Sequence, residues 1–251
     1  MTRKYDHIFF DLDHTLWDFE TNSREALKLT LEKHNLIDQL VSFDDFVTVY
    51  EAINARLWDD YRERKISKFF LTSQRFSMSL KSFVEEKYDS QQLNDSYLYF
   101  MAEQTGLYPQ VKEILLWLKL RGYQMHIITN GFQEVQHKKL KSSGLDQFIS
   151  KVFISEVVQS PKPERAIFEY ALKSCNARKI RSIMVGDNWE VDIAGALNFG
   201  IDQVMFRNGG QNKVPEEISK QLGPMSPVVF LRQKRNKTFF IDCLDELKLI
   251  V

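Results

Sequence analysis

The chain has 251 residues, of which 34 are Lys or Arg and 34 are Asp or Glu, so its formal net charge is zero. A balanced chain has no overall field that would draw it to DNA or to an anionic membrane, so we expect neither as a partner. With only 2 cysteines, 10 glycines and 6 prolines, the composition excludes a disulfide framework, a zinc site built from cysteines and a collagen-like chain.

Apolar runs in the sequence are short. The longest uninterrupted one extends from Tyr97 to Ala102, far below the roughly 20 residues that span a bilayer. The first residues become acidic at Asp11 and Asp13, where a signal peptide would need a long apolar stretch. We therefore expect two reduced thiols, Cys175 and Cys243, in a protein of the reducing cytoplasm.

The first informative segment is Ile8-Phe9-Phe10, followed by Asp11 and Asp13. Three bulky apolar residues in a row predict a short buried strand. Two aspartates are out of place in a core. They are expected where such a strand emerges at the edge of a parallel sheet, which is where open α/β folds bind their ligands.

Residues 19–99 contain almost no strand signal, and apolar residues recur there at helical spacing. We therefore expect an all-helical cap domain over 19–99, inserted after the first strand so that it could act as a lid over the sheet edge. The expected helices cover 22–34, a segment that begins after Ser42, 67–86 and 91–104.

From Pro109 onward, strand and helix patterns alternate, which favours a doubly wound parallel sheet of the α/β class. Residues 1–18 and 100–251 would form this α/β core, in which the closing residues are the least clear. The expected strands are 123–128, 151–154, 180–185, 204–206, 228–231 and 238–241, and the expected helices are 111–120, 132–143, 164–174, 191–198 and 244–249.

Carboxylates stand at the ends of two of these strands. Asp11 and Asp13 point the same way on an extended chain, because side chains alternate with period two. Close like charges need a cation or a proton between them, and oxygen ligands without His or Cys suit Mg²⁺. Asp187 would complete the site, and Asp192 could orient Lys162 or the waters of the metal. The alternative is a turn or a helix N-terminus with incidental acidic residues.

Three further residues follow strand candidates. Thr129 and Asn130 offer a hydroxyl, an amide and backbone N–H groups that can hold phosphate oxygens. Lys162 lies between Pro161 and Pro163, which restrict its backbone, and a fixed ammonium can neutralise a phosphate. An ordinary turn and a solvated loop lysine are the alternatives.

Taken together, these segments resemble the haloacid dehalogenase-like hydrolase superfamily. Asp-Leu-Asp-His-Thr (11–15) matches its first motif, Thr129 the second, Lys162 the third, and Gly186-Asp187 with Asp192 the fourth. The insert after the first motif matches the helical cap of one subfamily. The residues around the first and fourth motifs resemble those of the pyrimidine 5′-nucleotidase branch of this superfamily.

The resemblance implies a phosphatase with a Rossmann-like core. Asp11 would be the nucleophile and form an aspartyl-phosphate, and Asp13 would act as acid and then as base. Mg²⁺ would be held by Asp11, by the backbone carbonyl of Asp13 and by Asp187. Thr129 and Lys162 would bind the transferring phosphoryl group.

The substrate implied by the resemblance is a small phosphate ester, a nucleoside 5′-monophosphate above others. A sugar-phosphate phosphatase or a phosphomutase of the same superfamily remains open, because phosphomutase relatives keep both aspartates of the first motif. A non-catalytic phosphate-binding module is the alternative from another class. The presence of Asp11, Asp13, Lys162 and Asp187 argues against that module, because a site without catalytic activity has no physical need for all four residues.

Overall fold

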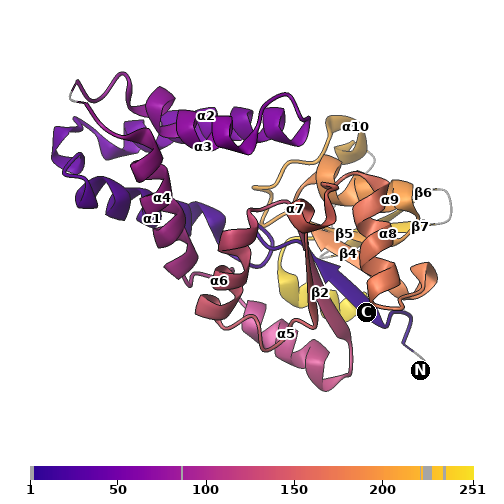
Figure 1. Cartoon of the computed structure of the whole chain (residues 1–251). Coiled ribbons are helices and arrows are strands. Elements are labelled where there is room, and N and C mark those ends of the chain that lie inside the picture. The colour runs from indigo at the N-terminus through magenta and orange to yellow at the C-terminus, as the bar shows by residue number, and fades with distance from the viewer. Residues whose placement is uncertain (1–2, 86, 221, 223–227, 234–235) are drawn as a thin grey trace. The chain divides into compact units, whose positions relative to one another are not determined.

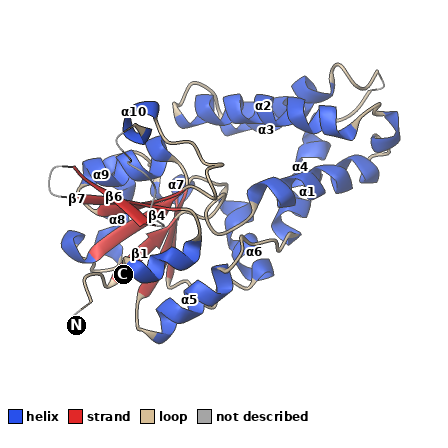
Figure 2. Ribbon diagram, turned by 180° about the vertical axis from the view of Figure 1, so that it is seen from behind, coloured by secondary structure: helices blue, strands red, loops and turns tan. Residues whose placement is uncertain are grey.

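A computed structural model describes residues 3–85, 87–220, 222, 228–233 and 236–251 of the chain. The chain divides into two compact units, one formed by Met1–Phe19 with Thr105–Val251 and the other by Glu20–Gln104. All the strands belong to the first unit, and the second unit is helical (Figures 1 and 2).

The first unit is built on one sheet. In the described part of the chain its strands are β1 (His7–Phe10), β2 (Gln124–Thr129), β3 (Lys151–Ile154), β4 (Ser182–Gly186), β5 (Asp202–Phe206), β6 (Val228–Gln233) and β7 (Asn236–Ile241). Their order across the sheet is β3-β2-β1-β4-β5-β7-β6. Neighbouring strands from β3 to β7 are parallel, and only the edge strand β6 is antiparallel to its neighbour. The predicted doubly wound α/β fold is thus confirmed.

Helices cover both faces of this sheet (Figure 1). Phe9 of β1 and Met184 of β4 share a buried apolar cluster with Phe168 and Phe199, which come from α8 (Arg165–Ser174) and α9 (Gly195–Phe199). On the other face lies α5 (Val111–Leu120), in contact with the closing 3₁₀ helix η4 (Leu244–Leu249). The remaining helical segments are α6 (Gln133–Ser143), α7 (Ser155–Val158), η2 (Lys179–Arg181), η3 (Trp189–Ala194) and α10 (Glu216–Ser219).

The sheet places the ends of β1, β2 and β4 side by side. Phe10 of β1 lies level with Ile127 of β2 on one side and with Val185 of β4 on the other. The backbone N–H of Asp11 continues this ladder by donating to the carbonyl of Val185 at 2.9 Å. The residues that follow these three strands therefore meet at one edge, at the point where the strand order reverses.

The second unit contains α1 (Phe19–Lys33), η1 (Ile37–Gln39), α2 (Phe43–Arg62), α3 (Lys68–Leu80) and α4 (Ser90–Glu103). Ser42 caps α2 as expected, because its side chain accepts a hydrogen bond from the backbone N–H of Asp45. The rings of Tyr50, Phe76 and Tyr97 pack together between the helices. Helix α4 ends at Glu103, close to the end of the helix expected over 91–104, and the helical unit extends to Gln104 rather than to residue 99. The lid function of this unit stays a prediction.

Some element bounds differ from the sequence-based expectation. The segment predicted as a helix over 191–198 begins earlier, with the π-helical η3, and becomes α-helical only in α9. The reason is Asn188, whose side chain accepts hydrogen bonds from the backbone N–H groups of Glu190 and Val191 and so starts the helix at Trp189. None of the helices within the described residues is both long enough and apolar enough to cross a membrane.

Candidate active site

A lysine and two aspartates form the buried centre of the site. Lys162 is 2% exposed, and its Nζ donates to Asp11 Oδ1 and, at 2.6 Å, to Asp192 Oδ1. Asp192 fits beside Gly186 only because that residue has no side chain, since a Cβ there would lie 2.5 Å from atoms of Asp192. The structure therefore brings together three residues that are far apart in the sequence, and Asp192 contacts Lys162 as expected.

The backbone of Lys162 is held by Asn130, which follows β2. Asn130 Nδ2 donates to the Lys162 carbonyl at 2.9 Å, and the Lys162 N–H donates to Asn130 Oδ1 at 2.8 Å. This reciprocal pair engages both polar atoms of the Asn130 side chain. The side chain thus fixes the loop that carries Lys162, and the role of Asn130 as a phosphate ligand stays a prediction.

Three carboxylates lie close enough together to share a cation. One oxygen each of Asp11, Asp187 and Asp192 lies within 4.8 Å of the others. Thr15 orients Asp187 by donating from Oγ1 to its Oδ1 at 3.0 Å. Lys162 is the ammonium ion-paired with this group, through Asp11 and Asp192, so negative charge is in excess. Such an oxygen-only donor set fits Mg²⁺. Asp11 and Asp187 are predicted metal ligands, whereas Asp192 was predicted only to support the site, and the Mg²⁺ site stays a prediction.

Burial first, and the neighbouring charges second, shift the pKa values of these groups. Burial raises the pKa of Asp11 from its ordinary value of 3.8 to about 7, against the opposing effect of Lys162. Burial also raises the pKa of Asp187 well above its usual range, and Asp11 and Asp192 add to this effect. Burial alone would lower the pKa of Lys162, but Asp11 and Asp192 outweigh burial and raise it. A bound divalent cation would favour the ionised carboxylates.

Asp13 points to different partners from those of Asp11. Its Oδ1 accepts from Lys139 Nζ at 2.6 Å, and its Oδ2 accepts from Gln136 Nε2 at 2.9 Å. Burial would raise the pKa of Asp13, but the charge and hydrogen bond of Lys139, with help from Gln136, outweigh burial and lower it. The carboxylate is therefore ionised and held by two donors. The predicted metal ligand is its backbone carbonyl, which stays a prediction.

Thr129, at the end of β2, is oriented by its neighbours. Its Oγ1 accepts from the Gly131 N–H at 3.1 Å and from Gln136 Nε2 at 2.6 Å. With both acceptor positions of the hydroxyl used, its own proton is available for an acceptor such as a phosphate oxygen. This arrangement suits the predicted role of Thr129 in binding the phosphoryl group.

Gln136 and Lys139 are the site residues that sequence reasoning missed. Both lie on α6 and are buried, at 1% and 3% exposure. Their helix is rich in polar residues, and its three lysines, Lys138, Lys139 and Lys141, look alike in the sequence. The available signal is position. The helix that follows Thr129 begins at the same sheet edge. Residues in its first turns that share its buried face with Val135 and Leu140 can therefore reach the site.

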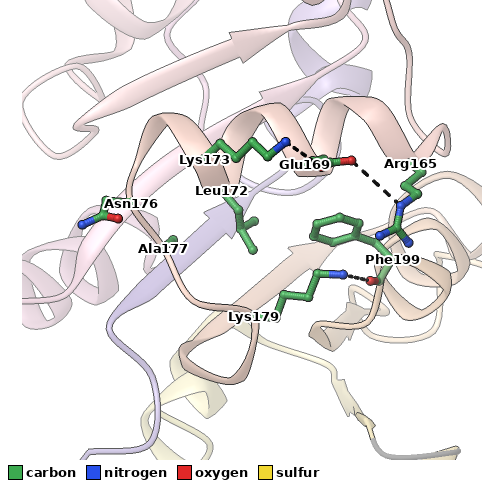
Figure 3. Close-up of a pocket in the computed structure, with 8 residues that line it drawn as sticks. All are labelled: Arg165, Glu169, Leu172, Lys173, Asn176, Ala177, Lys179 and Phe199. Carbon is green, nitrogen blue, oxygen red and sulfur yellow. Dashed lines mark hydrogen bonds and ion pairs between the residues drawn. The ribbon is translucent and has the colours of Figure 1, made fainter.

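A hollow of about 340 Å³ lies elsewhere in the first unit, beside α8 and Phe199 (Figure 3). Three cations line it. Arg165 and Lys173 form ion pairs with Glu169, and Lys179 donates to the carbonyl of Phe199. These basic groups are already engaged within the protein, and none of the predicted site residues lines the hollow. We therefore place the candidate active site at the strand ends and not in this hollow.

Comparison with known proteins identifies the family. A family model described as haloacid dehalogenase-like hydrolase matches residues 5–200. The chain belongs to this haloacid dehalogenase-like hydrolase family. The matched residues include the four segments that carry the predicted site, and the sequence-based expectation of an enzyme of this family is confirmed.

Two relatives are the pyrimidine 5′-nucleotidases PynA of Streptococcus pneumoniae and YjjG of Escherichia coli. PynA is 34% identical over 203 residues, which make up 80% of this chain and 84% of PynA. YjjG is 33% identical over 220 residues, which make up 86% of this chain and 92% of YjjG. Both similarities extend over most of each protein, so they include the core and the helical unit.

A solved structure shows the same fold. The HAD-hydrolase YfnB of Bacillus subtilis, determined with bound magnesium, matches this hydrolase with a TM-score of 0.80 and 25% sequence identity. The match covers 99% of each chain. The predicted Rossmann-like core is thus the fold of a solved member of the family.

Proposed function

We propose that this hydrolase is a phosphatase that acts on small phosphomonoesters through an aspartyl-phosphate, and that nucleoside 5′-monophosphates with pyrimidine bases are its best substrates. The observation that carries the chemistry is the contact of Lys162 with Asp11 at the strand ends, beside Asp187. The similarity to two pyrimidine 5′-nucleotidases supports the choice of substrate.

In the proposed first step, a carboxylate oxygen of Asp11 attacks phosphorus. A bond forms between this oxygen and phosphorus, and the bond from phosphorus to the alcohol oxygen breaks. Asp13 is ionised before substrate binds, so it must first take up a proton, which a monoanionic phosphate ester can supply. This proton then goes to the departing oxygen, so the alcohol leaves neutral. The ammonium of Lys162 donates a hydrogen bond to the Asp11 carboxylate, and there it can offset the repulsion between this carboxylate and the incoming phosphate.

In the proposed second step, water attacks the phosphorus of the aspartyl-phosphate. Asp13, now ionised, accepts the proton of this water, and the bond from phosphorus to Asp11 breaks to release inorganic phosphate. Asp13 is thereby ready to donate again. The two donors on its carboxylate, Gln136 and Lys139, suit the ionised form that this step needs.

The metal would be held by Asp11, by the backbone carbonyl of Asp13 and by Asp187. When bound, Mg²⁺ supplies positive charge that screens two anions from each other and stabilises the charge on the phosphoryl oxygens. Asp192 contributes by holding Lys162 at 2.6 Å. Thr129 donates its hydroxyl proton to a phosphoryl oxygen, and Lys162 binds another.

A panel of phosphate esters tests the choice of substrate. We expect the highest kcat/KM with pyrimidine nucleoside 5′-monophosphates, lower values with the purine nucleotides and lower still with sugar phosphates. Release of inorganic phosphate measures each rate under the same conditions. Equal and slow rates across the panel, or a clear preference for a sugar phosphate, would contradict the nucleotidase proposal.

Removal of divalent metal tests the proposed cofactor. We expect no turnover of any ester after treatment with EDTA and dialysis, and full recovery when MgCl₂ is added. The reason is that the carboxylates of Asp11, Asp187 and Asp192 outnumber the ammonium of Lys162 that pairs with them, and this excess of negative charge opposes the approach of a phosphate. Mg²⁺ should also raise the melting temperature, because it binds the folded site only. Unchanged activity in EDTA would contradict the metal site.

A further inference from the structure

Helix α6 binds both oxygens of the Asp13 carboxylate. Gln136 and Lys139 lie one helical turn apart, so their side chains project from the same face of the helix. One donates to Oδ2 at 2.9 Å and the other to Oδ1 at 2.6 Å. We call these two residues the Asp13 clamp. Two donors on two oxygens fix the plane of the carboxylate as well as its position.

Lys139, on α6, packs against the segment that carries Asp13. Its Nζ lies 3.9 Å from the ring centre of Trp17 and 5.4 Å from that of Phe19. Trp17 is itself fully buried, and its backbone N–H donates to the Leu12 carbonyl at 2.9 Å. Lysine is rarely buried unless it is paired. Here the partner is Asp13, whose side chain is 21% exposed, so the clamp holds a carboxylate that substrate can still reach.

Gln136 links Asp13 to the predicted phosphate-binding residue. Its Nε2 donates to Thr129 Oγ1 at 2.6 Å as well as to Asp13. The side chain has room because residue 131 is glycine, since a Cβ there would lie 2.1 Å from Nε2. Gln136 Oε1 has no partner among the described residues. One nitrogen of the Gln136 amide therefore holds both Asp13 and Thr129.

We propose that Gln136 and Lys139 are positioning residues that orient the Asp13 carboxylate toward the oxygen of the departing alcohol. This inference rests on the proposed function of Asp13. A general acid must lie within hydrogen-bond reach of the atom it protonates, and a free carboxylate would sample other rotamers. The Asp13 clamp keeps the Asp13 side chain in one rotamer before substrate binds.

Two substrates with different leaving groups test the inference in Lys139→Met. An alkoxide such as a nucleoside 5′-oxygen needs a proton to leave, whereas p-nitrophenolate leaves with little help. We therefore expect kcat/KM to fall on the order of 10²-fold with a nucleoside 5′-monophosphate, and to change little with p-nitrophenyl phosphate. The value of kcat/KM is the proper measure because it includes leaving-group departure and excludes the later hydrolysis.

A double-mutant cycle separates positioning from other roles. If Lys139 acts through Asp13, Lys139→Met should add nothing in a protein that already carries Asp13→Asn. The conservative variant Lys139→Arg should recover part of the rate with the nucleotide, because it restores a donor of the same charge. Lys138→Met is the matched control, since Lys138 is exposed on the same helix, and it should behave like the wild type.

The outcomes distinguish the inference from the proposed function. A wild type that hydrolyses neither ester would refute the proposed function itself. An active wild type whose Lys139→Met variant loses the same factor with both esters, or loses nothing with the nucleotide, would overturn the inference alone. If Lys139→Met does not fold, Gln136→Leu takes its place in the comparison of the two esters. Gln136 also donates to Thr129, so we expect a loss common to both esters and a further loss with the nucleotide alone. An equal loss with both esters would overturn the inference.

Discussion

Asp11→Asn is expected to abolish turnover of every phosphate ester while the protein stays folded. The amide oxygen is a poor nucleophile, so no covalent intermediate can form. Loss of a nucleophile from a cooperating catalytic group reduces kcat by several orders of magnitude, and we expect a loss of about 10⁴-fold or more. Steady-state release of phosphate from p-nitrophenyl phosphate measures this effect.

The stability of Asp11→Asn should follow from the burial of the carboxyl. Burial raises the pKa of Asp11 to about 7, so the folded site disfavours the ionised group, and a neutral amide of the same size removes that penalty. Lys162 keeps Asp192 as its partner in this variant, so the lysine is not left unpaired. Without Mg²⁺ the variant should therefore melt no earlier than the wild type, and added Mg²⁺ should stabilise it less. Asp38→Asn, which changes an exposed aspartate of the helical unit, is the matched control. Near-normal activity of Asp11→Asn would remove the nucleophile assignment.

Lys162→Met is expected to reduce both activity and stability. Loss of one charged donor at the phosphoryl group should lower kcat by about 10²- to 10³-fold. The change also leaves Asp11 and Asp192 without the ammonium that pairs with them. Removal of one partner from a buried ion pair destabilises proteins by about 3–5 kcal/mol. Urea unfolding measures the second effect and a phosphate-release assay the first.

The loss of stability in Lys162→Met should depend on pH with a definite sign. Burial already raises the pKa of Asp11 from 3.8 to about 7 although Lys162 opposes this shift, so removing Lys162 raises it further. The folded state then keeps a proton that the unfolded state has released, and stability falls as pH rises above the unfolded pKa. We expect a larger difference from the wild type at about pH 8 than at about pH 5. Lys138→Met is the control, and a difference independent of pH would contradict this account of the charges.

The centre of the site was predictable because it depends on strand ends. Ile8-Phe9-Phe10 indicates a buried strand, and the aspartate after it must emerge at the sheet edge. The same logic places Thr129 after β2 and Asp187 after β4. The order of strands then brings these positions together, because β1 lies between β2 and β4.

The hydrogen bonds that orient these groups were not predictable. Asn130 and Lys162 are 32 residues apart in the sequence, and their reciprocal pairing depends on how two loops meet. Lys139 looks like its exposed neighbour Lys138, and its burial follows from packing against Trp17. Such contacts depend on tertiary packing, which hydrophobic periodicity does not describe.

The element bounds show a similar limit. The pattern over 191–198 predicts a helix, but the side chain of Asn188 begins the helical segment at Trp189 in π-helical form. The strand predicted to begin at Ile180 begins at Ser182, after the 3₁₀ turn η2. Capping and turn contacts decide such bounds locally, and apolar spacing gives them only to within a few residues.

Location of the phosphoryl group tests the central proposal most directly. The protein would be mixed with a nucleoside 5′-monophosphate and Mg²⁺, quenched in acid within one turnover, digested and examined by mass spectrometry. The account predicts a phosphoryl group on Asp11 that is absent from Asp11→Asn. A phosphoryl group on any other residue, or an unmodified Asp11 at each time point while phosphate is being released, would contradict it.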